Sequence, residues 1–155
     1  MYKKVSTDMN FVEREKQVEK FWEDNQIFEK SMKVREGNPS YVFYDGPPTA
    51  NGKPHIGHVL TRVIKDMIPR YRTMKGYMVP RKAGWDTHGL PVELEVEKLL
   101  GLDGKDQIEE YGLEPFINKC KESVWKYKGM WEDFSSTVGF WADMENPYVT
   151  YDNNF

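Results

Sequence analysis

The sequence predicts an α/β fold built around one βαβ unit, with a sheet that is incomplete. A short β-prone run, Tyr41–Tyr44, stops at a glycine–proline turn, and a long helical pattern begins near Ile56 and stops at Gly76. A second short run, Tyr77–Pro80, then predicts another strand. This order predicts two parallel strands joined by a right-handed crossover. Two strands form too small a sheet to stand alone, so we expect the fold to be incomplete.

The residues before the first strand are expected to form a helical extension. Asn10 followed by Glu13 has the form of a capping box. Apolar residues then recur at helical spacing at Phe11, Val18, Phe21 and Trp22. We expect a helix over 11–25 whose aromatic face lies against the domain, followed by a loop over 33–40 that contains Gly37 and Pro39.

The crossover helix carries one apolar stripe, made of Leu60, Val63, Ile64, Met67, Tyr71 and Met74. Pro69 lies inside this pattern and predicts a kink or an earlier end, because proline cannot donate the intrahelical hydrogen bond.

Helices are predicted after the second strand, which Ala83-Gly84 closes. They cover 91–100, with Gly101 as a stop signal, a short segment near 106–111, and 115–134. One face of the last helix holds Phe116, Cys120, Val124, Tyr127, Trp131 and Phe134. The tail, 138–155, is aromatic and rich in asparagine, and we expect no closing element there.

The composition is that of one soluble domain. The 155 residues are 39% apolar and 30% charged, and no apolar run is long enough to cross a bilayer. The first residues lack the apolar region of a signal peptide. Cys120 is the single cysteine, so the chain has no internal disulfide and no cysteine-based zinc site, which fits a reducing cytoplasm.

The charges are divided between two neighbouring blocks. Residues 53–82 hold eight Lys or Arg and one acid, and residues 86–114 hold nine acids and two lysines. A basic block beside a glycine-rich turn could serve phosphates, but a solvated helix face would have the same composition, and charge alone does not decide between them.

The segment most informative about chemistry is 45–58, DGPPTANGKPHIGH. It lies where a strand ends and a helix begins, and backbone N–H groups and the helix dipole there favour anions such as the phosphates of ATP. His55 and His58 are one helical turn apart and can face the same ligand, while Gly57 lets a flat base or ribose approach the backbone. Two imidazoles that donate to phosphoryl oxygens would stabilise a phosphoryl-transfer transition state. Zinc ligation and a purely structural histidine pair are the alternatives.

A second segment, 84–91 or GWDTHGLP, ends the second predicted strand and should lie beside the first. Asp86 could hold a substrate ammonium group by a charge-assisted hydrogen bond. Alternatively, Asp86 or Thr87 caps the helix that begins near Pro91. His88, as a lone histidine, is more typical of a packed residue than of a catalyst.

Together these segments resemble the class I aminoacyl-tRNA synthetases. The approach 44–52 runs into His55-Ile56-Gly57-His58, the signature of that class. The helix with Ile64-Lys65-Asp66 and Pro69-Arg70-Tyr71, the block 84–93, and the tail with Gly139-Phe140-Trp141 and 146–150 are similar to the isoleucyl members. Leucyl members differ at Pro47-Pro48 and Thr87-His88, and valyl members at 86–89, so isoleucine is preferred and valine is the nearest alternative.

The resemblance implies the first βαβ half of a Rossmann-like catalytic domain, with flanking helices. It implies that His55 and His58 are catalytic. The implied ATP-binding residues are Pro48, Thr49, Asn51, Gly52, His55, Gly57 and His58. The amino-acid site would include Gly46, Pro47 and Asp86, with Asp86 on the α-ammonium. Isoleucine, ATP with Mg²⁺, and tRNA(Ile) are the implied partners of a monomeric cytoplasmic enzyme, and neither DNA nor a membrane is implied.

The resemblance also implies a division into three parts, and the absence of others. Residues 1–40 would be the helical extension, 41–135 the first catalytic half, and 136–155 the start of a connective or editing insertion. The lysine-rich loop that completes the ATP site, the anticodon-binding region and any zinc-binding segment are not in this sequence. We therefore expect little or no ligase activity from these residues alone. A non-ligating nucleotide-binding module and an interaction domain are the alternative functions.

Overall fold

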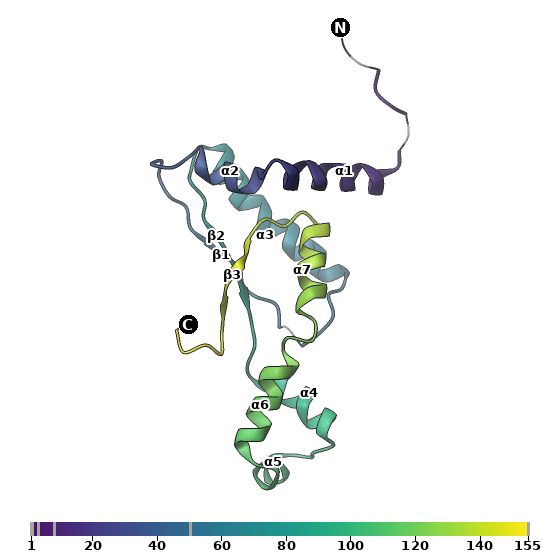
Figure 1. Ribbon diagram of the computed structural model, residues 1–155, viewed down its shortest axis with the longest axis vertical. Coiled ribbons are helices and arrows are strands. Elements are labelled where there is room, and N and C mark those ends of the chain that lie inside the picture. The colour runs from purple at the N-terminus through teal and green to yellow at the C-terminus, as the bar shows by residue number, and fades with distance from the viewer. Residues whose placement is uncertain (1, 3, 8, 50, 155) are drawn as a thin grey trace.

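The computed structural model describes residues 2, 4–7, 9–49 and 51–154. Its elements, in chain order, are α1 (Phe11–Asp24), α2 (Ile27–Lys33), β1 (Phe43–Tyr44), α3 (Ile56–Met74), β2 (Arg81–Trp85), α4 (Leu90–Leu100), α5 (Lys105–Tyr111), α6 (Leu113–Ser123), α7 (Lys128–Thr137) and β3 (Asp143–Val149). The molecule is elongated, with the sheet near its middle (Figure 1). Helices α1 and α2 lie at one end and α4, α5 and α6 gather at the other (Figure 1).

The sheet has three parallel strands in the order β1-β2-β3. Phe43 pairs with Arg81 in the β1–β2 ladder, and Trp85 pairs with Val149 in the β2–β3 ladder. The parallel pair flanking α3 confirms the predicted βαβ unit. The expectation of a tail without a closing element is wrong, because β3 adds a strand there. Its sequence, DMENPYV, lacks the β-prone pattern that would have predicted it.

The second strand begins later than its sequence pattern predicts. The run 77–80 contributes one isolated bridge, between Ser40 and Met78, and the strand proper is β2. β2 begins with two cations, which single-sequence patterns disfavour in a strand. The first, Arg81, is 2% exposed, and its Nη1 lies 3.2 Å from Oδ1 of Asp66 on α3. Burial lowers the pKa of Arg81 to about 10 against the opposing effect of Asp66, so the guanidinium stays charged at neutral pH and stays paired.

Helix α3 buries its polar side and exposes its apolar side. Arg62, Asp66 and Pro69 are the buried residues of this helix. The predicted apolar stripe, with Ile56 and Ile68, is between 42% and 83% exposed: Ile56, Leu60, Val63, Ile64, Met67, Ile68, Tyr71, Met74. The helix continues through Pro69, so the expected earlier end is wrong. The loss of one N–H does not stop a helix held on both sides of the proline by the ion pairs of its buried face.

Helix α1 is confirmed, but most of its aromatic face is exposed. The Glu13 amide donates to Asn10 Oδ1 at 3.1 Å, as the capping pattern predicted. Phe11 and Phe21 are 59% and 56% exposed, whereas Trp22 packs edge-on against Trp141 with 5.0 Å between ring centroids. The expected packing of the whole aromatic face is therefore wrong. Helix α2 was not predicted.

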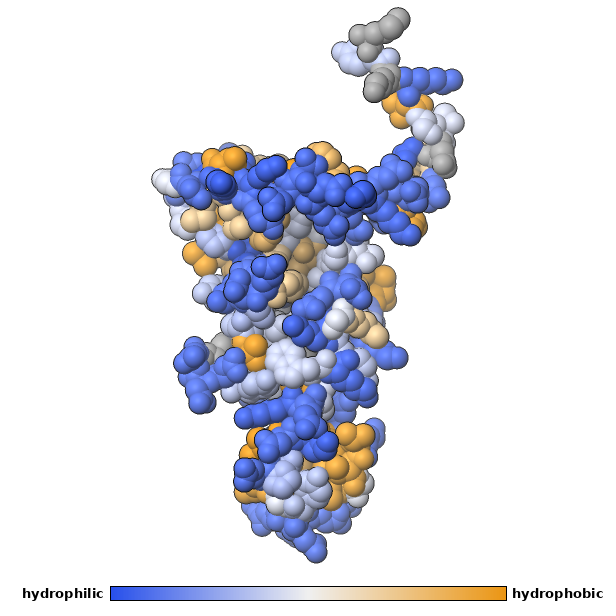
Figure 2. Space-filling model, in the orientation of Figure 1, coloured by the Kyte–Doolittle hydropathy of each residue, from blue (hydrophilic) through white to orange (hydrophobic). Residues whose placement is uncertain are grey.

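The expected helix over 115–134 is two helices, α6 and α7, separated at 124–127, while α4 and α5 are confirmed. The predicted apolar face still converges, because Val124 and Trp131 form a buried cluster with Trp85 and Val92. Hydrophobic side chains gather on the surface of the end formed by α4, α5 and α6 (Figure 2). Across the described residues, no helix combines the length and apolarity that a membrane span requires.

Candidate active site

The loop 45–55, here called the signature loop, joins the end of β1 to the start of α3 and lies beside the loop after β2. The Asp86 amide donates to the Pro48 carbonyl at 3.2 Å, and Thr49 and Asp86 form an isolated parallel bridge. Asn51 Nδ2 donates to the Pro91 carbonyl at 2.8 Å. These contacts confirm that the two segments singled out by the sequence meet at one edge of the sheet, at the carboxyl ends of the strands.

The two histidines of the signature together cap helix α3. The Gly57 amide donates to Nδ1 of His55 at 3.1 Å, and the His55 amide donates to Nδ1 of His58 at 3.0 Å. Because both Nδ1 atoms accept a hydrogen bond, each neutral ring carries its proton on Nε2. The ring centroids are 3.8 Å apart. The pair therefore offers two adjacent Nε2–H donors at a helix amino terminus, where the backbone also favours an anion.

Gly57 is needed by the His55 ring. A Cβ placed on Gly57 would lie 2.9 Å from Cε1 and 3.1 Å from Nδ1 of His55, closer than side chains approach. The glycine thus makes room for the capping imidazole. Its predicted role in admitting a base or ribose stays a prediction.

His58 is packed so that it stays neutral. Burial lowers its pKa, and the charges of His55, Arg62 and Lys65 lower it further. The ring of Trp131 on α7 meets the His58 ring edge-on, with 4.7 Å between the centroids and 69° between the planes. A neutral imidazole keeps the Nδ1 lone pair that the cap requires.

A buried carboxylate at the start of the signature loop holds this loop to α3. Asp45 is 2% exposed, with Arg62 Nη1 3.4 Å from Oδ2 and Lys65 Nζ 2.9 Å from Oδ1. Lys65 Nζ also donates to the Gly46 carbonyl at 2.6 Å. Sequence reasoning assigned no role to Asp45 and missed its ion pairs with the two cations. The available signal was that Arg62 and Lys65 lie one turn apart on the polar side of α3.

The loop after β2 is fastened by Thr150, just beyond β3. Thr150 Oγ1 accepts from the Thr87 amide at 3.0 Å and lies 2.6 Å from His88 Nδ1. The N-cap of α4 is Gly89, with no side-chain cap, so the alternative in which Asp86 or Thr87 caps that helix is wrong. Within the described residues, the Asp86 carboxylate has no hydrogen-bond partner, which leaves its oxygens available to a ligand.

Tyr148 of β3 reaches across β2 to the start of the signature loop. Its hydroxyl donates to the Asp45 carbonyl, and its ring lies over Gly84, where an added Cβ would come within 2.2 Å of it. Burial raises the pKa of Tyr148, and Asp45 and Asp86 raise it further, so the phenol stays protonated. Sequence reasoning did not single out this residue, because nothing local predicts a contact across the sheet.

Nine of the ten predicted site residues therefore lie on the signature loop and the first turn of α3, and the tenth, Asp86, lies against them. The first nine are Gly46, Pro47, Pro48, Thr49, Asn51, Gly52, His55, Gly57 and His58. Ala50, which belongs to the same motif, is outside the described residues. The ligand contacts assigned to the ten stay predictions. In the described ranges, no three His, Cys, Asp or Glu side chains are grouped so as to hold a metal ion.

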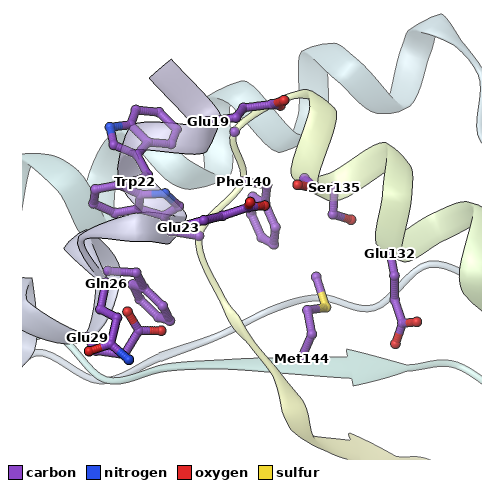
Figure 3. A pocket seen from close by; sticks show the side chains of 13 residues that line it. Glu19, Trp22, Glu23, Gln26, Glu29, Glu132, Ser135, Phe140 and Met144 are labelled. Atoms are coloured by element: carbon purple, nitrogen blue, oxygen red, sulfur yellow. The ribbon is translucent and has the colours of Figure 1, made fainter. Parts of the chain in front are cut away.

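A hollow of about 370 Å³ lies apart from the signature loop, between α1, α2, α7 and the chain entering β3 (Figure 3). Its walls combine aromatic rings with four carboxylates: Glu19, Glu23, Glu29 and Glu132. An acidic lining is unsuited to phosphate, so this hollow is chemically unlike the signature loop.

Comparison with known proteins gives concordant results. A family described as tRNA synthetases class I (I, L, M and V) matches residues 17–155. An isoleucine–tRNA ligase of Clostridium novyi (strain NT) is 61% identical and one of Clostridium kluyveri is 63% identical, each over all 155 residues. The chain spans 15% of the length of these two relatives.

A crystal structure with a similar fold is the ternary complex of Agrobacterium radiobacter K84 agnB2 LeuRS with tRNA and LeuAMS. The similarity has a TM-score of 0.64 at 19% identity, and it covers 94% of this chain and 16% of that one. At this identity the comparison concerns the fold alone.

Proposed function

Because the chain belongs to the class I tRNA synthetases, we propose that it forms the first half of the active site of an isoleucine–tRNA ligase. In the proposed reaction, isoleucine and ATP give isoleucyl-adenylate and pyrophosphate, and the isoleucyl group then passes to tRNA(Ile). The isoleucine specificity is supported by relatives of that name at 61% and 63% identity.

The observation that carries the proposal is the shared cap made by His55 and His58. Nδ1 of each ring accepts a backbone amide at the start of α3, at 3.1 Å for His55 and 3.0 Å for His58. Each ring therefore keeps an Nε2–H donor for a ligand. The donors are held before any ligand arrives, which is the arrangement that stabilises a developing charge without reorganisation.

These donors suit the chemistry of adenylate formation. A carboxylate oxygen of isoleucine attacks the α-phosphorus, and the bond from that phosphorus to the bridging oxygen of the β-phosphate breaks. The electron pair of that bond leaves with pyrophosphate, so charge grows on the phosphoryl and leaving oxygens. Hydrogen bonds from His55 and His58 to those oxygens strengthen as the charge grows, and so lower the barrier.

The amino-acid side of the proposed site is the loop after β2. Asp86 would accept the α-ammonium of isoleucine, and Gly46 and Pro47 would lie against the substrate. The support is that Asp86 is fixed through its own backbone to Pro48, at 3.2 Å, while its carboxylate lacks a protein partner among the described residues. Pro48, Thr49, Asn51, Gly52 and Gly57 are proposed to contact ATP from the signature loop and helix start.

Magnesium is proposed to enter with the triphosphate. Mg²⁺ keeps several waters and is usually held by phosphates with one or two carboxylates, so it does not require a preformed protein cage. Its contribution would be to neutralise charge on the triphosphate.

The division of the sequence into 1–40, 41–135 and 136–155 stays part of the proposal, and so does a cytoplasmic location. Within the third part, β3 belongs to the same sheet as β1, the strand that precedes the signature loop, so this segment would support the site as well as begin an insertion.

A chimera tests the proposal. The matching segment of the Clostridium novyi ligase is replaced by this chain, and ATP–pyrophosphate exchange is measured with isoleucine and with valine. We expect exchange that depends on isoleucine. Replacing His55 or His58 by alanine should slow it by about 10²- to 10³-fold, the usual effect of removing one such donor.

His58→Asn separates catalysis from capping. Asparagine can place an acceptor where Nδ1 lies but has no donor where Nε2 lies, so it should keep the helix cap and still lose exchange. Lys20→Ala, on the exposed side of α1, is the control and should leave exchange unchanged. A folded chimera without isoleucine-dependent exchange, or one that prefers valine, would contradict the proposal.

A further inference from the structure

Trp131 connects three parts of the site from a helix that no sequence motif implicates. It lies on α7 and is 2% exposed, and its Nε1 donates to the carbonyl of Gly52 at 2.7 Å. Its ring meets the His58 ring at 4.7 Å, and the guanidinium of Arg62 lies 5.6 Å from its centroid. We propose that Trp131 is a positioning residue that sets the signature loop and the His58 ring relative to each other. This inference rests on the proposed function.

The contact with Gly52 anchors the half of the signature loop nearest the histidines. Asp45 fixes the beginning of the loop through its ion pairs, and Pro48 is tied to Asp86. Gly52 is itself exposed, and its φ is not in the left-handed region that would favour glycine. The indole N–H therefore holds the loop at a position where neither burial nor backbone preference would fix it.

The contact with His58 restrains the ring that is proposed to touch phosphate. The indole meets the imidazole edge-on, at 4.7 Å between centroids, and the centroid of the His55 ring lies 3.8 Å from that of His58. A ring that contacts two neighbouring rings and is tied at Nδ1 has little freedom to rotate. The ring is then already ordered in the free protein, so little conformational entropy is lost when the transition state forms.

Arg62 extends this arrangement to the buried carboxylate. Its guanidinium lies between the Trp131 ring and Asp45, and Phe140 flanks it at 4.4 Å. Trp131 thus meets the loop at Gly52 directly and at Asp45 through Arg62. Displacing the indole would loosen both ends of the loop together.

The test compares two tryptophans of the same hydrophobic cluster in the active chimera. Trp131→Phe removes the N–H but keeps an aromatic ring and most of the apolar volume. Trp125→Phe removes a similar bond, from Nε1 to the Tyr151 hydroxyl at 3.0 Å, which does not involve the signature loop. The readouts are kcat and KM for ATP and for isoleucine, together with the thermal midpoint.

We expect Trp131→Phe to lower kcat/KM for ATP by about 2- to 12-fold, the range for one net hydrogen bond. KM for isoleucine and the thermal midpoint should match those of Trp125→Phe, which should keep the ATP parameters of the parent. Equal ATP parameters in the two variants would overturn the inference, and so would equal losses for both substrates in parallel with lost stability. A parent chimera without exchange would instead refute the proposed function, and the inference with it.

A second measurement does not depend on turnover. In the 155-residue chain labelled with ¹³C-histidine, Trp131→Leu removes the indole that shields His58. The pKa of His58 should then rise toward its ordinary value. An unchanged His58 titration would overturn the inference even if the Trp131→Phe chimera did not fold.

Discussion

Replacing Asp45 by asparagine should strongly destabilise the fold, because it leaves a buried cation without its partner. The Asp45 side chain is 1% exposed and that of Arg62 is 5% exposed, whereas Lys65 is 33% exposed and can turn to solvent. Burial already lowers the pKa of Arg62 against the opposing effect of Asp45, so removing the carboxylate removes what supports the charge.

The expected loss is about 3–5 kcal/mol, the range for breaking a buried ion pair by deleting one partner. A domain has about 5–15 kcal/mol in total, so the loss would be a large part of the whole. Lys65 should add little to it. Urea unfolding followed by tryptophan fluorescence measures the change, since Trp131 lies beside Arg62.

A double-mutant cycle separates the energy of the Asp45–Arg62 ion pair from other effects of replacing Asp45. Adding Arg62→Met to Asp45→Asn removes the orphaned charge and should recover much of the loss. The control is Asp24→Asn, which breaks a pair with Lys20 whose side chains are 57% and 74% exposed, and should cost less than about 1 kcal/mol. If Asp45→Asn costs no more than Asp24→Asn, or if Arg62→Met gives no recovery, the reasoning from burial is refuted.

Three further predictions concern packing, protonation and activity. Gly84→Ala should lower the free energy of unfolding in urea by about 1–3 kcal/mol, because its Cβ would enter the Tyr148 ring. The control is Gly129→Ala, which lies in open space on α7 and should raise that free energy by about 0.4–1 kcal/mol. Equal effects of the two changes would contradict the described packing of β3 on β2. The lowered pKa of His58 means that the folded protein binds fewer protons than the unfolded chain just below pH about 6.5, so the free energy of unfolding should fall as the pH drops through that value. His58→Asn should reduce that slope, and a pKa of His58 above the ordinary value, measured by NMR, would reverse the sign. The 155 residues alone should form little or no isoleucyl-tRNA in an aminoacylation assay, since in the proposed ligase the ATP site is completed by other segments, and rapid ATP-dependent charging would refute that expectation.

The βαβ unit was predictable because its signals are local. A β-prone run, a turn and an amphipathic helix each depend on neighbouring residues, so their order gave the parallel pair and the place of the ligand crevice. The start of β2 was misplaced because Arg81 is compensated by Asp66, fifteen residues earlier, a pairing no local pattern expresses. Strand β3 was missed for a similar reason, since backbone pairing with β2 holds a segment of low strand propensity.

The contrast between local signals and long-range contacts applies to the candidate site as well. Its proposed ligand-facing residues are nearly contiguous in sequence, and motif reasoning found them. The residues that hold them come from much farther along the chain: Trp131 is 79 residues from Gly52, and Tyr148 is 103 residues from Asp45. Sequence reasoning placed Trp131 on the apolar face of a helix, which agrees with its burial but does not reveal what the indole N–H contacts.

The order of the strands has a consequence for how this region is made in the cell. β2 is the central strand, and its second neighbour, β3, follows only after four helices, about sixty residues later. At about 5–20 residues per second, a ribosome would need roughly 3–12 s to deliver it. During that interval Gly84 would lack the covering Tyr148 ring, and one edge of β2 would be open to pairing with other chains. The nascent chain is therefore most vulnerable to aggregation between the emergence of β2 and that of β3.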